Sequence, residues 1–237
     1  MTTFSLLAGL GASLGLWQVT RSAQPQHVRN LLDFGLITLL VALLGGRAFF
    51  VAVHSVYYAL HPLESVQLWQ GGYSWPGAAA GGLLSLAVIA LVKRRSLAWL
   101  ADGLAPLLGP LAVGLWLGCW QAGLVYGASL PMGSMGIPTV DESGLVSLRV
   151  PLQMLCALGL VAYLWLVDHI LASLNGRSHH HGLKASLFGL GLGLDLLAAS
   201  RLRADPVPYW GTLGVDTWCA LGLVALCVIG FLVSLWD

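Results

Sequence analysis

The chain has 237 residues, of which 57% are hydrophobic and only 9% are charged, and its 11 basic and 10 acidic side chains nearly cancel. An ordinary soluble domain carries about 25% charged residues, so this chain could not cover a water-facing surface of its size. The composition therefore excludes a soluble globular protein and a nucleic-acid-binding protein with a basic patch, and it indicates an integral membrane protein.

Seven apolar stretches are candidate transmembrane helices, because about 20 apolar residues span the hydrocarbon core of a bilayer. In chain order they cover residues 4–19, 31–58, 77–92, 98–118, 152–170, 183–200 and 210–236. Polar or Gly- and Pro-rich loops at 59–76 and 127–150 are the main interruptions. The predicted fold class is an all-α bundle of about seven helices, forming a single transmembrane domain over residues 1–237.

The basic residues are distributed unevenly between the two sides of this predicted bundle. One side carries Arg21, Arg29, Lys93, Arg94, Arg95, Arg177 and Lys184, and the other carries Arg149, Arg201 and Arg203. Cytoplasmic loops are enriched in Lys and Arg, so the sequence predicts an outer N-terminus and a cytoplasmic C-terminus. The loops 59–76 and 127–150 would then lie on the outer side.

Neither the cysteines nor the histidines suggest a metal or redox site. Cys119, Cys156, Cys219 and Cys227 lie in or beside apolar segments, where cysteine behaves as a small hydrophobe. His179, His180 and His181 are adjacent, whereas ligands on one helix face need a spacing of four residues. We expect no metal and no cofactor, with a bound phospholipid as the candidate ligand.

Three ionisable side chains lie inside predicted helices, where they are costly and suggest function. Arg47, Asp195 and Asp216 all fall in the outer half of the bundle, if each residue advances a helix by about 1.5 Å. One interpretation is a structural ion pair between Arg47 and one of the two acids. The other is that Arg47 binds the phosphate of an anionic lipid headgroup. Asp102, near the start of the fourth segment, is expected to complement the dipole of its own helix.

A glycine-rich segment at 71–77 precedes the third predicted helix on the outer side. Gly71, Gly72 and Gly77 allow close backbone approach, and Ser74 is a candidate N-cap. A helix N-terminus with free N–H groups also binds anions, which makes this segment a second candidate for a lipid headgroup. A simple glycine-rich turn explains the same residues equally well.

A series of short motifs runs along nearly the whole chain in a characteristic order. They are Val28-Arg29-Asn30-Leu31-Leu32, Leu44-Gly45-Gly46-Arg47, Trp69-Gln70-Gly71-Gly72-Tyr73-Ser74-Trp75-Pro76-Gly77, Ala101-Asp102-Gly103, Gly123-Leu124-Val125-Tyr126-Gly127 and Arg149-Val150-Pro151-Leu152-Gln153. Together they resemble the prolipoprotein diacylglyceryl transferase family. The resemblance implies seven spans in a bacterial inner membrane and transfer of a diacylglyceryl group from phosphatidylglycerol to a lipoprotein cysteine.

The chain departs from the family at the positions that carry charge or a proton. Pro76 stands where the family has a histidine, and Trp116, Cys119 and Leu124 stand where its signature has arginine, asparagine and glutamate. The reaction needs a base for the thiol proton and positive charge opposite the departing phosphate, which these residues do not supply. Tyr73, Trp75, Trp116 and Trp120 would instead line an aromatic cavity.

Two functional hypotheses follow from this mixture of matches and departures. The first is a transferase-like protein without catalytic activity that serves as a lipid-binding or structural subunit of a membrane complex, with phospholipid and other membrane proteins as partners. The alternative is an active phosphatidylglycerol–prolipoprotein diacylglyceryl transferase or a related lipid-modifying enzyme. A cavity with inward polar groups favours the enzyme, and an aromatic plug favours the subunit.

Overall fold

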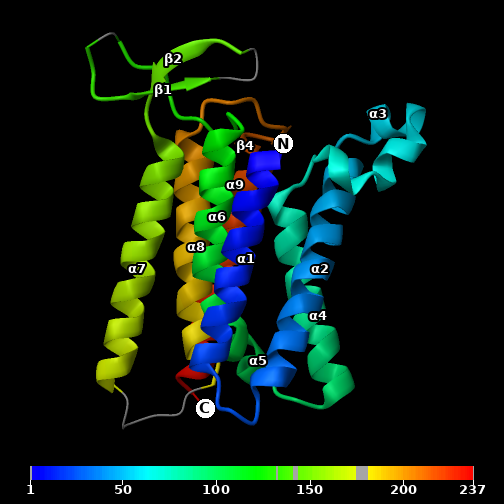
Figure 1. Ribbon diagram of the computed structural model, residues 1–237, viewed down its shortest axis with the longest axis vertical. Helices are drawn as coiled ribbons and strands as arrows, with labels where there is room; N and C mark the ends of the chain where they lie inside the picture. Colours follow the sequence, from blue (N-terminus) through cyan, green and yellow to red (C-terminus); the bar gives the residue numbers. More distant parts are fainter. Residues whose placement is uncertain (1, 132, 141–143, 175–180, 237) are drawn as a thin grey trace.

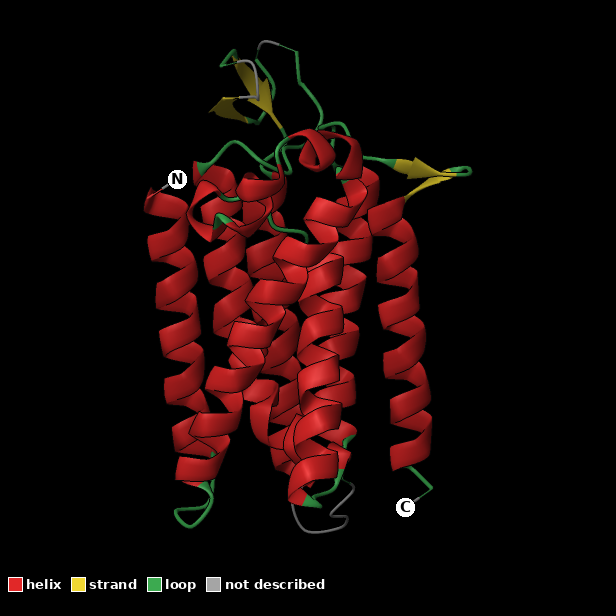
Figure 2. Cartoon of the chain, turned by 90° about the vertical axis from the view of Figure 1, so that its right-hand side faces the viewer, coloured by secondary structure: helices red, strands yellow, loops and turns green. Residues whose placement is uncertain are grey.

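The computed structural model describes residues 2–131, 133–140, 144–174 and 181–236 and consists mainly of long helices along one axis (Figures 1 and 2). The α-helices are α1 (Thr2–Ser22), α2 (Val28–Val53), α3 (Ser55–Leu60), α4 (Trp75–Lys93), α5 (Leu97–Leu104), α6 (Leu108–Gln121), α7 (Leu152–Leu174), α8 (Leu183–Leu202) and α9 (Val215–Ser234). The 3-10 helices are η1 (Pro62–Val66), η2 (Leu68–Gln70) and η3 (Ala105–Leu107). Two antiparallel hairpins pair β1 (Ile137–Val140) with β2 (Val146–Arg149) and β3 (Tyr209–Trp210) with β4 (Leu213–Gly214).

Within the described ranges, six helical segments are long and apolar enough to cross a membrane. They are α2, α4, the α5–α6 segment Leu97–Gln121, Leu152–Ser173 of α7, α8 and α9. The 21-residue helix α1 runs along α6 in the same bundle as a seventh long segment (Figure 1). The prediction of an all-α integral membrane protein is confirmed, and the chain is a multi-pass membrane protein.

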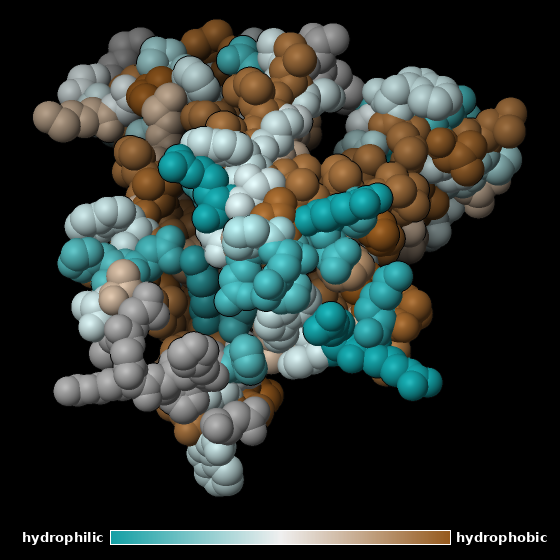
Figure 3. Space-filling view, turned by 60° about the horizontal axis from the view of Figure 1, so that its bottom comes forward, coloured by the Kyte–Doolittle hydropathy of each residue, from teal (hydrophilic) through white to brown (hydrophobic). Residues whose placement is uncertain are grey.

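The lateral surface of the bundle, along the sides of the long helices, is apolar, as a surface in contact with lipid must be. Leu40, Leu84, Leu158 and Ile229 are among many large hydrophobic side chains that point away from the core. Hydrophilic side chains gather at the end of the bundle that Figure 3 turns toward the viewer, while brown apolar side chains cover the flanks. This distribution separates a membrane-facing belt from a polar end.

The helices pack in pairs, α1 on α6, α2 on α4 and α8 on α9, and α7 lies against α6 and α8. The backbones of α2 and α4 approach each other at Gly45 and Gly77, where a Cβ on either residue would lie under 3.0 Å from the carbonyl oxygen of the other. Small residues allow this approach, which is a common basis of helix association in membranes. Glycine at 77 therefore serves the packing of two transmembrane helices.

The connections at 54–74 and 203–214 and the described residues of 122–151 lie at the same end of the bundle as the start of α1, and the end of α9 lies at the other (Figure 1). The loops predicted at 59–76 and 127–150 therefore share one end. The assignment of that end to the outer side stays a prediction. Of the three adjacent histidines, only His181 belongs to the described residues, where it is exposed, and the prediction for His179 and His180 lies outside them.

Two predicted helix boundaries are wrong. The second helix ends at Val53 instead of continuing to residue 58, and a turn at His54 separates it from α3. The last helix begins at Val215 instead of Trp210, because residues 209–214 form a hairpin with Gly211 at φ +66°. Asp216 consequently lies in the first turn of α9 and is not two turns deep in the bundle.

Candidate functional site

Arg47, six residues before the C-terminal end of α2 at Val53, is 4% exposed and is surrounded by backbone carbonyls. Its Nε donates to Ser65 O at 3.1 Å, Nη1 donates to the carbonyls of Gly71 and Gly72, and Nη2 donates to Glu64 O. The burial of Arg47 is as predicted. The predicted ion pair with Asp195 or Asp216 is wrong, because the 64–72 segment folds over α2 and satisfies the guanidinium with carbonyl dipoles.

Of the candidate headgroup residues in the glycine-rich segment, Gly71 and Gly72 contact Arg47, whereas Ser74 and Gly77 contact α2 at Gly46 and Gly45. Gly72 has φ +72°, and a Cβ there would lie 2.8 Å from Nη1 of Arg47, so only glycine fits. Ser74 is the N-cap of α4, but its hydroxyl makes no capping hydrogen bond, and its N–H donates to Gly46 O at 3.0 Å. The contacts assign Arg47, Gly71 and Gly72 the role of fixing this loop to α2. Lipid binding by these residues stays a prediction.

The four aromatic residues predicted to line one cavity belong to two helix pairs. Tyr73 and Trp75 lie at the start of α4, which packs on α2, whereas Trp116 and Trp120 lie on α6, which packs on α1 and α7. The hydroxyl of Tyr73 donates to Leu68 O at 2.5 Å. A cavity shared by all four stays a prediction.

Trp116 and Asp195 form a polar contact between α6 and α8. The indole Nε1 of Trp116, which is 6% exposed, donates to Oδ2 of Asp195 at 2.8 Å. Asp195 forms no ion pair with any described residue. Its carboxyl group therefore lies inside a membrane-spanning helix and accepts a hydrogen bond from a neutral donor, the indole of Trp116.

A charged cluster lies above this contact, at the end where α8 stops and α9 starts. Nε of Arg203 donates to Oδ1 of Asp205 at 2.8 Å, Nη2 donates to Oδ2 of the same carboxylate, and Nη1 donates to Asp216 at 2.6 Å. Burial lowers the pKa of Arg203, but the hydrogen bond and charge of Asp205, together with the charge of Asp216, outweigh this effect and raise the pKa. The guanidinium is therefore charged and fully engaged by two acids.

Residues 123–127, which we call the signature loop, follow α6 and are fixed from two sides. Asp205 accepts a hydrogen bond from Val125 N at 3.3 Å, and Gln153 of α7, which is 1% exposed, donates to Leu124 O at 2.7 Å. Val125 has φ +55°, which is rare for a β-branched residue and costs roughly 1–3 kcal/mol. Buried polar groups from α7 and from the end of α8 stabilise this strained conformation.

A polar cavity of about 280 Å³ opens beside the charged cluster. Its lining includes Arg203 and Asp205 together with Ser200, Arg201, Tyr209, Thr212 and Thr217. Thr217 donates to Ser200 at 3.2 Å, and the exposed Arg201 forms no ion pair or side-chain hydrogen bond with the described residues. The cavity thus combines hydroxyl groups with one cation that is available for an anion.

Several of these functional groups are absent from the sequence-based candidates. Arg203 and Arg201 served there only to predict topology, although an Arg-x-Asp pattern directly after an apolar segment is a detectable signal. Nothing in the sequence around Gln153 indicated that its side chain would fix a loop.

The predicted role of Asp102 is wrong. It does not complement the dipole of its own helix but accepts hydrogen bonds from Gly182 N at 2.6 Å and Ala185 N at 2.8 Å, at the N-terminus of α8. All four cysteines are free, and the described residues contain no group of three metal-ligating side chains.

Comparison with known proteins assigns this architecture to a family. The family described as prolipoprotein diacylglyceryl transferase matches residues 1–233. The phosphatidylglycerol–prolipoprotein diacylglyceryl transferase of Nitrosomonas europaea is 30% identical over 94% of this chain and 81% of its own length. The corresponding enzymes of Bacillus licheniformis and Bacillus velezensis are 37% and 32% identical over 48% of this chain, and these matches span 43% of their length. The chain belongs to the prolipoprotein diacylglyceryl transferase family.

Proposed function

We propose that the protein is a lipid-modifying enzyme of the bacterial cytoplasmic membrane that transfers a diacylglyceryl group from phosphatidylglycerol to a lipoprotein cysteine. The family membership supports a lipid-modifying membrane function. The observation that carries the proposal is the polar cavity of about 280 Å³ beside the signature loop, with Arg201 in its lining.

The cavity matches the headgroup of phosphatidylglycerol, which is a phosphate linked to a glycerol with two hydroxyl groups. Ser200, Thr212 and Thr217 offer hydroxyl donors and acceptors for the glycerol. Arg201 offers a guanidinium, whose planar donors suit a phosphate. Arg203 forms part of the cavity wall but is not available to bind a phosphate, because it is paired with Asp205 and Asp216.

The transfer also needs a proton acceptor, and Asp195 is our candidate. It lies five residues before Ser200 on α8, about 7.5 Å along the helix axis. In the proposed step the substrate thiol gives its proton to Asp195, and the sulfur forms a bond to the glyceryl carbon. The bond from that carbon to the phosphate oxygen breaks, and glycerol phosphate leaves with the electron pair next to Arg201.

The test is transfer of a labelled diacylglyceryl group from phosphatidylglycerol to a cysteine-containing lipoprotein peptide, using the purified full chain. We expect Asp195→Asn and Arg201→Gln each to lower kcat/KM about 10²-fold. Arg21→Gln, at the other end of the bundle, should leave the rate unchanged. Transfer by the wild type that survives both substitutions would contradict the assigned roles.

A second candidate function is a catalytically inactive, lipid-binding or structural subunit of a membrane complex. It rests on the departures that the family resemblance implies at Pro76, Trp116, Cys119 and Leu124, where charged or polar residues are expected. This hypothesis predicts that the wild type binds phosphatidylglycerol but transfers nothing. It also predicts no rescue of a strain depleted of its own transferase, although the protein is present in the membrane. Growth with modified lipoprotein would exclude the inactive subunit.

A further inference from the structure

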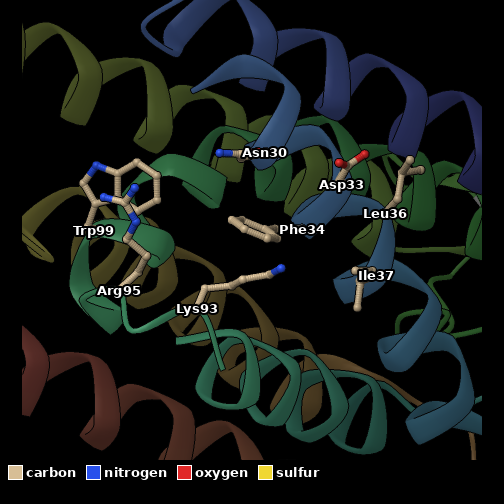
Figure 4. A pocket seen from close by; sticks show the side chains of 8 residues that line it. All are labelled: Asn30, Asp33, Phe34, Leu36, Ile37, Lys93, Arg95 and Trp99. Carbon is tan, nitrogen blue, oxygen red and sulfur yellow. The ribbon is translucent and has the colours of Figure 1, made fainter. Parts of the chain in front are cut away.

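A groove of about 620 Å³ lies at the opposite end of the bundle from the polar cavity, where α2 begins and α4 ends (Figure 4). One wall comes from the first turns of α2, and the other comes from the α4–α5 connection and the start of α5. Its lining is Asn30, Asp33, Phe34, Leu36, Ile37, Lys93, Arg95 and Trp99. The groove shares no residue with the cavity proposed for the transfer reaction.

Two cations give the groove a positive charge. Lys93 extends its ammonium group into the groove beside Phe34, and the guanidinium of Arg95 lies 5.6 Å from the ring centroid of Trp99 (Figure 4). Asp33 is the acid of the lining, and no ion pair among the described residues joins it to Lys93 or Arg95. The lining therefore carries a net charge of +1, with a lysine that has no protein partner in the described part of the chain.

The rest of the lining is apolar and continues into the membrane-facing surface. Phe34 is buried and forms the floor, while Leu36 and Ile37 are exposed along α2. One turn further along the same helix, Leu40 is also exposed, within a segment that can cross the membrane. A ligand that fills this groove must be anionic where it meets the cations and apolar where it follows α2.

We infer that this groove binds an anionic diacyl phospholipid, with its phosphate at Lys93 and Arg95 and an acyl chain along Leu36 and Leu40. Trp99 supplies the amphipathic ring that is common at the headgroup level of membranes. Asn30 and Asp33 can hydrogen-bond a headgroup hydroxyl, which favours phosphatidylglycerol as the probe. The site does not depend on the proposed transfer reaction, because its residues lie at the other end of the bundle.

Native mass spectrometry of the detergent-purified full chain can count bound lipids in equimolar phosphatidylglycerol and phosphatidylcholine. All variants carry Arg201→Gln, so that the polar cavity proposed for the transfer reaction loses its free cation. In this background we expect a selective phosphatidylglycerol adduct, and a loss of affinity of about tenfold or more when Lys93→Gln/Arg95→Gln is added. The matched control is Arg21→Gln/Arg94→Gln, which removes the same charge at the same end but no residue of the groove. It should retain the adduct, and so should Lys93→Arg.

Three results would overturn the inference. Equal loss in the control variant would mean that only the overall charge of this end attracts the lipid. Displacement of the adduct by glycerol 3-phosphate would assign the groove to a soluble anion, because that molecule lacks acyl chains. Equal retention of phosphatidylcholine would mean that the cations do not select the headgroup. None of these results concerns transfer activity, so the proposed function is tested separately.

Discussion

Single polar side chains connect parts of the chain that are far apart in sequence. Asp205 accepts hydrogen bonds from Arg203 and from Val125 N, which is 80 residues away. A buried acid of this kind is stable only with its partners, because desolvation of a charge costs several kcal/mol. The geometry of the signature loop therefore depends on a residue outside that loop.

We predict that Asp205→Ala destabilises the protein by about 3–5 kcal/mol. The partly buried Arg203 guanidinium keeps only Asp216 as a partner, and Val125 N loses the acceptor that holds its strained conformation. The measurement is thermal unfolding in detergent. The matched control is Asp168→Ala, which breaks the more exposed ion pair between Lys184 and Asp168 at 2.9 Å and should cost about 1 kcal/mol or less. Equal losses of stability in the two variants would show that the contacts of Asp205 stabilise the protein no more than an exposed ion pair does.

At the scale of elements, two devices place the helices relative to one another. Glycines bring the backbones of α2 and α4 together, and a carboxylate on α5 caps α8. Glycine and aspartate do little to stabilise their own helix, but here each stabilises a contact with a second helix. Each can be tested by a substitution that leaves its own helix intact.

We expect Gly77→Leu to separate α2 from α4 and to destabilise the protein by roughly 1–3 kcal/mol or more, since the side chain would overlap the Gly45 carbonyl. Gly82→Ala on the same helix is the control. Its Cβ would meet Thr38 and Ala42 at ordinary distances of 3.8 and 3.9 Å. Thermal unfolding should show a loss for the first variant and none for the second, and no loss for Gly77→Leu would contradict the close packing.

Asp102→Ala should weaken the first turn of α8, because Gly182 N and Ala185 N lose their acceptor and the helix dipole loses its anion. We expect a cost of about 1 kcal/mol, or roughly fivefold faster hydrogen exchange at these amides. Asp33→Ala is the control, since the exposed Asp33 makes no hydrogen bond to α8. Unchanged exchange in the Asp102 variant would remove the capping role.

The whole molecule has two chemically different ends. The connections that carry the charged cluster, the signature loop and the hairpins occupy one end (Figure 1). The helix ends at the other carry Arg21, Arg29, Lys93, Arg94, Arg95 and Lys184. The termini lie at opposite ends, which fits an odd number of spans. This asymmetry is what the positive-inside rule uses to assign orientation.

We predict that reporter fusions after Lys93 and after Lys184 are cytoplasmic, because basic residues concentrate at that end. A fusion after Ser134, in the connection at the other end, should be exoplasmic. Enzymatic reporters that are active on only one side of the membrane measure this directly. A fusion after Lys93 or Lys184 that reads exoplasmic would reverse the orientation and move the polar cavity to the cytoplasmic face.

The sequence by itself determined the class of protein and the positions of its long helices. Apolar runs of sufficient length form helices in lipid, because every backbone group must be satisfied within the segment, and this rule needs no knowledge of the partners. The burial of Arg47 could be predicted for the same reason, since a charge at that depth must face the protein. The hairpin at 209–214 was not predicted, because Trp210 and Leu213 have the apolar character of the helix that follows and were assigned to it.

Only the tertiary structure decided which groups meet. Arg47 contacts carbonyls of the 64–72 segment, Asp195 contacts Trp116, and Asp102 contacts the start of α8. Polar partners in a bundle are set by helix rotation and by the path of the loops, and these depend on packing of the whole chain. The cavity near Arg201 arises in the same way, from the junction of α8, α9 and their connection, and no single segment of the sequence contains it.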